Sequence, residues 1–499
     1  MRLRSRTSGT HYGSFQYSLA LCEHSFSLKD KADFDRFLKG EFRDAAPDLA
    51  EDTTYRFLSP IHELRHFQDQ FGTLAGISLF QSRILTLKRF ARAVRELWRR
   101  NATWRLPIAD WLKDTDCPTE VRAFHKVARA ERLCANLFLG NFLPIKTDGH
   151  LEPLIVEVDT DLGLKLDAAT LRVSQEGNAT ARNETILYPF GVEVLFEASA
   201  HAITRSIGGA VASPTVEAAL EQRLRVPLTH RTAVEEAVTP YMILDLLVTR
   251  HMRKNGYKGF PRDLILGLAD EVLSCCPMII EELPDGRALS AMDRPGTALL
   301  DVLDKGDIGA FAEGRVKVAA EVDAVYTRVL KQIEQGGDWD TVLDDGSLDA
   351  DVAIWEAYAA QHFIRPLLEL RRATRHDAFR TVQGFVNVLN SLPAAMSVID
   401  GRLTSRPNMP ERVIAAWWKI ALVDEFVSAL VAGRPLACPR AHDSIPGLAG
   451  SRLARDGRCS THIALGCGTF GGHGEIELPV CWFQNGLVHT RFLPASPPI

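Results

Sequence analysis

Apolar residues recur every three or four positions along most of this chain, a spacing that gathers them on one face of a helix. The pattern predicts helices over residues 31–42, 59–72, 74–105, 118–140, 214–226, 232–253, 261–275, 296–303, 308–334, 350–373, 376–391 and 410–430. Apolar and polar residues alternate instead over residues 11–22, which predicts a strand. The chain is therefore expected to be largely helical.

A second region with strand character interrupts the helices. Leu154–Val158, Leu162–Leu166 and Thr170–Val173 are short apolar runs separated by Asp and Gly residues, which predicts a β-meander. The fold class that follows is mainly α with small β elements (α+β). The predicted regions are 1–147 with the N-terminal strand, 148–190 with the inserted meander, 191–335 and 350–435 as helical regions, and 436–499 as a Cys/His/Gly-rich tail.

Composition limits the possible functions. A chain of 499 residues exceeds what one core usually holds, so several subdomains are expected. The net charge of −5 gives no overall attraction to nucleic acid or to anionic membranes. The nine cysteines lack the spacing of a disulfide framework, which favours a reducing compartment such as the cytoplasm. No apolar run approaches the ~18 residues of a membrane span.

Chemistry concentrates in the stretch His62-Glu63-Leu64-Arg65-His66. Two histidines four residues apart project from one helix face, so both imidazoles can reach one ion. Glu63 lies about 100° around the helix from His62, where it can contact a water molecule without binding the ion. Ser59 and Pro60 predict the start of this helix, and Gly72 predicts its end in a left-handed conformation.

The His-Glu-x-x-His pattern resembles the active-site helix of the zincin metallopeptidases. The metzincin branch is excluded because Asp69 and Gly72 occupy its glycine and third-histidine positions. Glu197-Ala-Ser-Ala-His201 resembles the Glu-x-x-Ala-Asp pattern of some gluzincins, with histidine in place of aspartate. The resemblance therefore implies Glu197 as third ligand, with Glu193, one turn earlier, as the alternative.

The resemblance also implies a mechanism and a small sheet beside the active-site helix. Because only about sixty residues precede His62, this sheet is expected to be small or to be completed by later strands, and the meander could supply them. His62, His66 and Glu197 would hold Zn²⁺, and Glu63 would act as general base on zinc-activated water during peptide-bond cleavage. Independently of the resemblance, Asp69 shares the histidine face of the helix, where it could accept a ring N–H of a ligating histidine or could simply be a polar residue near the helix end. The candidates for an oxyanion donor are Tyr188, His201 and His230.

Three other hypotheses remain open at the level of sequence. The zincin-like site could be structural or degenerate in an interaction or regulatory protein without catalytic activity. The arginines and lysine of residues 83–105 could bind nucleic acid, although a solvated helix face explains them more simply. Cys438, Cys459, Cys467 and Cys481, with His442, His462, His473 and His489, could form a second metal site. The preferred partner is a peptide or protein substrate.

Overall fold

The structure is a computed structural model of the chain. It describes residues 13–16, 20–24, 36, 47–139, 145–146, 151–159, 165–175, 184–211, 237–238, 240–257, 262–275, 295–305, 320–393, 396–399, 402–404, 409–431 and 488–492. The predicted helix at 214–226, His230 and nearly all of the 436–499 tail lie outside these residues.

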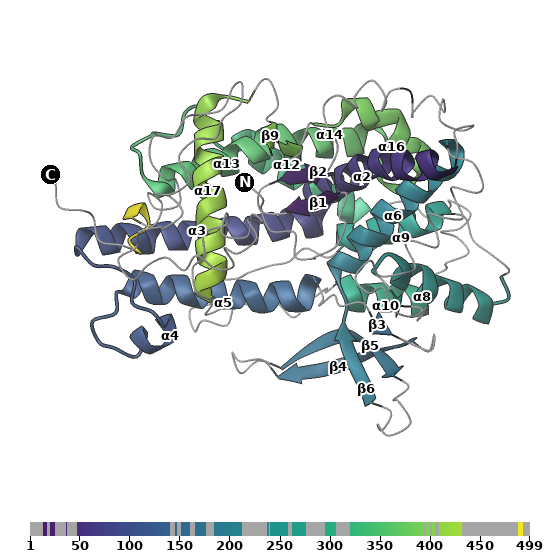
Figure 1. Cartoon of the computed structure of the whole chain (residues 1–499), viewed down its shortest axis with the longest axis horizontal. Coiled ribbons are helices and arrows are strands. Elements are labelled where there is room, and N and C mark those ends of the chain that lie inside the picture. Colours follow the sequence, from purple (N-terminus) through teal and green to yellow (C-terminus); the bar gives the residue numbers. More distant parts are fainter. Residues whose placement is uncertain are drawn as a thin grey trace.

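The described part is mainly α with small β elements, which confirms the predicted fold class. Its helices are α2 (Pro47–Gly72), α3 (Leu74–Arg99), α4 (Ile108–Trp111), α5 (Thr119–Leu139), α6 (Val192–Val211), α8 (Pro240–Lys254), α9 (Arg262–Cys275), α10 (Pro295–Lys305), α12 (Ala320–Gln335), α13 (Leu348–Ala359), the π-helix η3 (Ala360–Ile364), α14 (Arg365–Ala373), α15 (Asp377–Arg380), α16 (Val382–Val388), the short 3₁₀ turn η4 (Leu389–Ser391) and α17 (Glu411–Val431). Its strands are β1 (Gly13–Gln16), β2 (Leu21–His24), β3 (Ile145–Lys146), β4 (Leu151–Asp159), β5 (Lys165–Gln175), β6 (Glu184–Pro189), β7 (Ala237–Val238), β8 (Met396–Ile399) and β9 (Arg402–Thr404). Figure 1 shows α6 next to α2, α9 next to α6, and α3 and α5 side by side with α17 crossing them.

Helix α2 carries the His-Glu-x-x-His pattern, but it begins at Pro47, well before the predicted start. Ser59 and Pro60 therefore lie inside the helix, and their assignment to its cap and first turn is wrong. A proline inside a helix removes one backbone hydrogen bond. Leu58 and Ile61 on either side of Pro60 are 3% and 1% exposed, so burial of the surrounding turns stabilises the helix through the proline.

The predicted end of this helix at Gly72 is confirmed, but the reason for glycine differs from the prediction. Among the described glycines only Gly256 and Gly346 have positive φ, so Gly72 does not adopt the left-handed conformation. A Cβ at Gly72 would lie 2.4 Å from Cε1 of Phe379. Glycine is needed here because α15 approaches the end of α2 too closely for a side chain.

Two hydrophobic cores meet at α2. Phe67 and Phe71 belong to the core formed with α3, α5, α12, α13, η3, α14 and α17, where the Phe363 ring lies 5.3 and 5.5 Å from theirs. Leu58 and Ile61 belong to the core formed with α6, α8, α9 and α10. The turn-rich residues 336–347 connect α12 and α13, which share the first core, so the predicted boundary at 335–350 does not separate two cores.

The sheet beside α2 has four strands in the order β1-β2-β8-β9. The single strand predicted at 11–22 is instead two antiparallel strands, with Ala20 at φ 50° in the turn before β2. Strand β2 then pairs in parallel with β8, so that Leu21 lies opposite Met396. The sheet is completed by β8 and β9, so the expectation that the meander supplies its strands is wrong: β4, β5 and β6 form a separate sheet. Strands β1 and β2 pack against α2.

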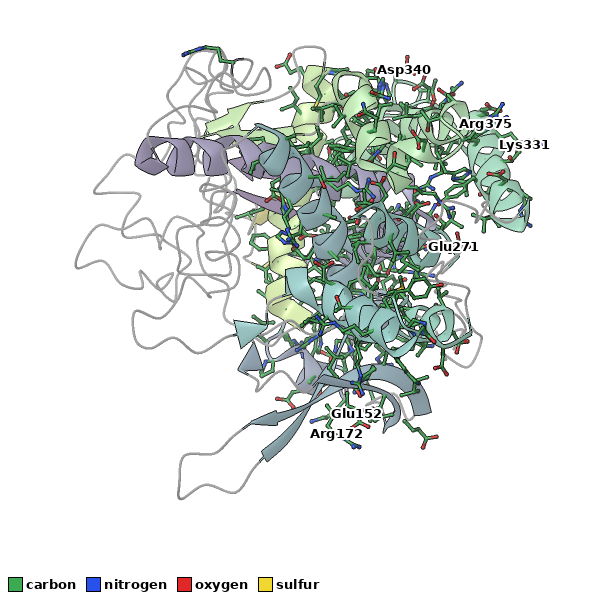
Figure 2. The ribbon with its side chains drawn as sticks, turned by 90° about the vertical axis from the view of Figure 1, so that its right-hand side faces the viewer. Glu152, Arg172, Glu271, Lys331, Asp340 and Arg375 are labelled. Atoms are coloured by element: carbon green, nitrogen blue, oxygen red, sulfur yellow. The ribbon has the colours of Figure 1, made fainter. Side chains whose placement is uncertain are left out.

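Strands β4, β5 and β6 form the expected antiparallel meander, although their boundaries differ from the prediction. The run at 170–173 and residues 165–166 of the preceding run belong to one strand, β5, while residues 162–164 lie outside the described residues. Asp167 lies within β5, opposite Glu157 of β4, and the third strand is Glu184–Pro189. Figure 2 shows Glu152 and Arg172 on this sheet, where they pair across β4 and β5 at 3.0 Å.

Residues 488–492 lie against the C-terminal end of α3, although almost 400 residues separate them in the chain. The indole N–H of Trp104 donates to the carbonyl of Thr490 at 2.8 Å, and Arg491 Nε donates to the carbonyl of Ala102 at 2.7 Å. The Phe492 ring stacks on Trp104 with 5.7 Å between ring centroids. This segment therefore covers an aromatic cluster at the end of α3.

No helix in the described part of the chain is long and apolar enough to cross a bilayer.

Candidate metal centre

Three side-chain atoms from α2 and α6 converge on one point. His62 Nε2 lies 3.0 Å from His66 Nε2 and 3.1 Å from Glu197 Oε2, and His66 Nε2 lies 3.3 Å from the same carboxylate oxygen. The expected proximity of Glu197 to both histidine rings is thus observed. Within the residues described, this is the one group of three or more His, Cys, Asp or Glu side chains arranged to hold a metal ion.

Helix geometry and packing bring the three residues together. His62 and His66 are one turn apart on α2, and their rings meet edge to face with centroids 4.6 Å apart. Glu197 comes from α6, which packs directly against α2. The side chains of His62 and Glu197 are 15% and 17% exposed and that of His66 is 3% exposed, so the cluster is largely buried but retains some access to solvent.

The spacing of these atoms suits a small four-coordinate cation. Three electron-rich atoms this close repel one another unless a proton or a cation lies between them. Bonds of 2.0–2.1 Å in a tetrahedron would separate the ligand atoms by about 3.3 Å, close to the separations observed. Burial raises the pKa of Glu197, but the imidazoles of His66 and His62 lower it further, so the carboxyl group has a pKa below its usual range and is ionised.

Thr204 on α6 lies beside the Nδ1 atom of His62. Its hydroxyl donates to the carbonyl of Ala200 at 2.7 Å, so its oxygen is left to accept from His62 Nδ1, which lies 3.5 Å away. A proton on Nδ1 leaves the lone pair on Nε2, the atom that faces Glu197 and His66. Thr204 therefore favours the tautomer that a metal ligand requires.

Glu63, the predicted general base, follows His62 on α2 and is 4% exposed. The helix turns its side chain about 100° from that of His62, so that it flanks the two histidines. A buried carboxylate beside a cluster of this kind is suited to accept a proton from water.

Asp69 does not have the surroundings expected of it. Both carboxylate oxygens face Arg65, at 3.0 Å from Nε and 2.9 Å from Nη2, and Oδ2 also accepts the hydroxyl of Ser199. The expected acceptor of a histidine N–H is instead paired with a buried guanidinium. The reason is that Arg65, one turn before Asp69, is itself fully buried and needs an anion.

The other candidate residues have different outcomes. His201 is 6% exposed, one turn after Glu197 on α6, and Glu193 lies one turn before Glu197, outside the group of three. Tyr188 lies opposite Leu171 in the pairing of β6 with β5, and its side chain is not among those described. His230 lies outside the described residues, and so does the proposed second metal site, apart from His489.

Reasoning from the sequence missed Arg65, Ser199 and Thr204. For Arg65 a signal was present, because an arginine four residues before Asp69 on the same helix forms an i,i+4 ion pair. Ser199 and Thr204 could not be found in this way, since their partners lie more than 100 residues away in the chain.

Six of the eight basic residues at 83–105 pair with carboxylates. Arg83 pairs with Asp424 at 2.6 Å and with Glu131 at 2.9 Å. Further ion pairs join Lys88 to Glu356, Arg95 to Asp349, Arg99 and Arg100 to Glu96, and Arg105 to Asp116. Phosphates would compete with these carboxylates for the same charges, which argues against the nucleic-acid hypothesis.

Comparison of the chain with protein-family models, with curated proteins and with solved structures gives no match.

Proposed function

We propose that this protein is a zinc-dependent hydrolase, a metallopeptidase that acts on peptide or protein substrates. The observation that carries the proposal is the convergence of His62 Nε2, His66 Nε2 and Glu197 Oε2 within 3.3 Å of one another. Two histidines, one carboxylate and an open side form the usual ligand set of a catalytic zinc site. A structural site would normally be closed by a fourth protein ligand.

Each side chain has a role in this proposal. His62, His66 and Glu197 would hold the ion, and Thr204 would keep the lone pair of His62 directed at it. When bound, zinc would supply Lewis acidity and would make water in the site more acidic. Glu63 would accept the proton from that water and pass it to the leaving amine. His201 and Tyr188 stay candidates for an oxyanion donor.

The proposed location is the cytoplasm. Its support is the odd number of cysteines, nine, without framework spacing, which suits a reducing compartment.

Metal analysis tests the first half of the proposal. The purified protein is expected to carry about one zinc per chain and to lose it in His62→Ala and His66→Ala, because two ligands cannot hold the ion tightly. Elemental analysis of the wild type and both variants measures this directly. A wild type that neither retains nor binds zinc would rule out the proposal.

Glu63→Gln tests the second half. The amide matches the carboxylate in size but cannot accept a proton, so zinc content should persist while hydrolysis falls by about 10²- to 10⁴-fold. Glu96→Gln is the matched control, because Glu96 is similarly buried, at 6% exposed, but lies on α3 away from the cluster. Cleavage of a peptide library at equal zinc occupancy is the assay. Equal activity in wild type and Glu63→Gln would favour the alternative, a non-catalytic interaction or regulatory protein.

A further inference from the structure

The contact between α2 and α6 has polar groups on two opposite sides. On one side His62 and His66 meet Glu197. Ser199 is two residues after Glu197, which places it about 200° around α6, on the other side of the contact. There it meets Asp69, which lies on α2 beyond the histidines. Between the two sides the interface is apolar, and the Phe196 ring lies 6.5 Å from the ring of His66.

Arg65, Asp69 and Ser199 form a fully buried cluster, which we term the latch. All three residues are 0% exposed. The Ser199 hydroxyl contacts Asp69 Oδ2 and also lies 3.0 Å from the carbonyl of Phe196, while Arg65 Nε lies 3.4 Å from the same hydroxyl oxygen. Hydrogen bonds between charged and neutral groups away from water are strong and directional.

The latch is in turn fixed to a third part of the fold. Arg65 Nη2 donates to the carbonyl of Phe379 at 2.9 Å, and Arg65 Nη1 donates to Gln68 Oε1 at 2.9 Å. Gln68 Nε2 donates to the carbonyl of Ala378 at 3.0 Å. These hydrogen bonds hold Arg65 and Gln68 of α2 against α15. Asp69, the acceptor of Ser199, is therefore paired with an arginine that is itself fixed in position.

We propose that the latch is a positioning device that sets the rotation of α6 about its axis against α2, and through it the distance from Glu197 to the two histidines. The inference rests on the proposed metal site. Hydrogen bonds on both sides of the α2–α6 contact fix the rotation of α6 about its axis. Hydrogen bonds on one side alone would let α6 rotate on the apolar part of the contact. Without the Ser199 hydroxyl, α6 is held to α2 on the metal side alone, and the three ligand atoms keep their spacing less well.

The consequence is measurable as zinc affinity. Side chains that hold metal ligands in place typically contribute about 10- to 100-fold to metal affinity. Ser199→Ala removes one hydroxyl from the side of the interface away from the ion, and it touches no ligand atom. A loss of affinity in this variant therefore reports positioning rather than a lost ligand.

The control variant is Ser274→Ala. Ser274 is 1% exposed on α9, and its hydroxyl makes a 2.7 Å hydrogen bond with Tyr326, which has no part in the metal cluster. It thus matches Ser199 in residue type, burial and loss of one buried hydrogen bond. Any general effect of reduced stability on zinc binding will appear equally in both variants.

The experiment is competition for Zn²⁺ between the full-length protein and a chromophoric chelator, with the Co²⁺ absorption spectrum as a readout of ligand geometry. We expect Ser199→Ala to bind Zn²⁺ about 10- to 100-fold more weakly than wild type, with an altered Co²⁺ spectrum, while Ser274→Ala stays close to wild type. Unchanged affinity in Ser199→Ala, or equal losses in both variants, would overturn the latch while leaving the proposed function intact. A wild type that binds no zinc would overturn both.

Discussion

Asp270 on α9 is the anion that pairs with two arginines, Arg371 and Arg380, and Asp270→Asn removes its charge while keeping its shape. Its carboxylate accepts hydrogen bonds from Arg371 Nη1 and Nη2 at 3.1 and 2.7 Å and from Arg380 Nε at 2.9 Å. Asp270 and Arg371 have fully buried side chains. Arg371 Nε also donates to the carbonyl of Gly72, the last residue of α2. The substitution therefore disturbs the support of the helix that carries the proposed metal ligands.

The expected cost follows from these contacts. Burial raises the pKa of Asp270, but Arg371 and Arg380 lower it further, so the carboxyl group is ionised in the folded protein. Removing one partner of a buried ion pair leaves a charge without compensation and typically costs about 3–5 kcal/mol. Arg380 still pairs with Glu271, so the loss falls mainly on Arg371.

Guanidinium unfolding followed by circular dichroism and tryptophan fluorescence measures this cost. Asp263→Asn is the matched control, since Asp263 lies on the same helix, is exposed, and accepts one backbone N–H, from Val382 at 2.9 Å. That variant should lose about 1 kcal/mol or less. If the free energies of unfolding of the two variants differ by less than about 1 kcal/mol, the assignment of Asp270 as an essential counter-ion is refuted.

Three further predictions concern α2 and its surroundings. Gly72→Ala should lose about 1–3 kcal/mol of stability in the same unfolding assay, because its Cβ would meet Phe379 at 2.4 Å. Phe379→Leu should partly restore this stability, and an unchanged unfolding midpoint in Gly72→Ala would contradict the close approach. Thr204→Val should weaken zinc binding by about tenfold without a large change in stability, since His62 loses its acceptor, and chelator competition would detect this. Burial and an adjacent guanidinium lower the pKa of His376, so the unfolded chain binds the extra proton below about pH 6.5 and stability should fall as pH decreases from 7 to 5. The pH slope should be shallower in His376→Asn, which tolerates the φ of 70° at this position, and an equal slope would exclude His376 as its source.

The residues that converge at the cluster could be predicted because each belongs to a local pattern. His62 and His66 are one helical turn apart, and this spacing does not depend on the rest of the fold. Glu197 could be selected because it begins the local pattern Glu197-Ala-Ser-Ala-His201 on a downstream helix. The alternative, Glu193, is one turn away on the same helix. The packing of α6 on α2 decides between the two, because it brings Glu197 to the histidines.

The features that could not be predicted depend on contacts between distant segments. The start of α2 was misplaced because Pro60 is a strong local signal, whereas the burial of Leu58 and Ile61 comes from tertiary packing. The partner of Asp69 includes Ser199, 130 residues away, and β2 pairs with β8 across most of the chain. No local periodicity encodes such pairings.

The position of residues 488–492 has a consequence for how the chain folds as it is made. Trp104 and Thr490 are 386 residues apart, so at about 5–20 residues per second roughly 20–80 s pass between their synthesis. Throughout this interval the aromatic cluster at the end of α3 lacks Phe492, which stacks on Trp104 and meets Phe426 at 5.1 Å. Until residues 488–492 have been synthesised, the nascent chain therefore exposes an apolar surface at the end of α3, and this surface is where a chaperone would bind.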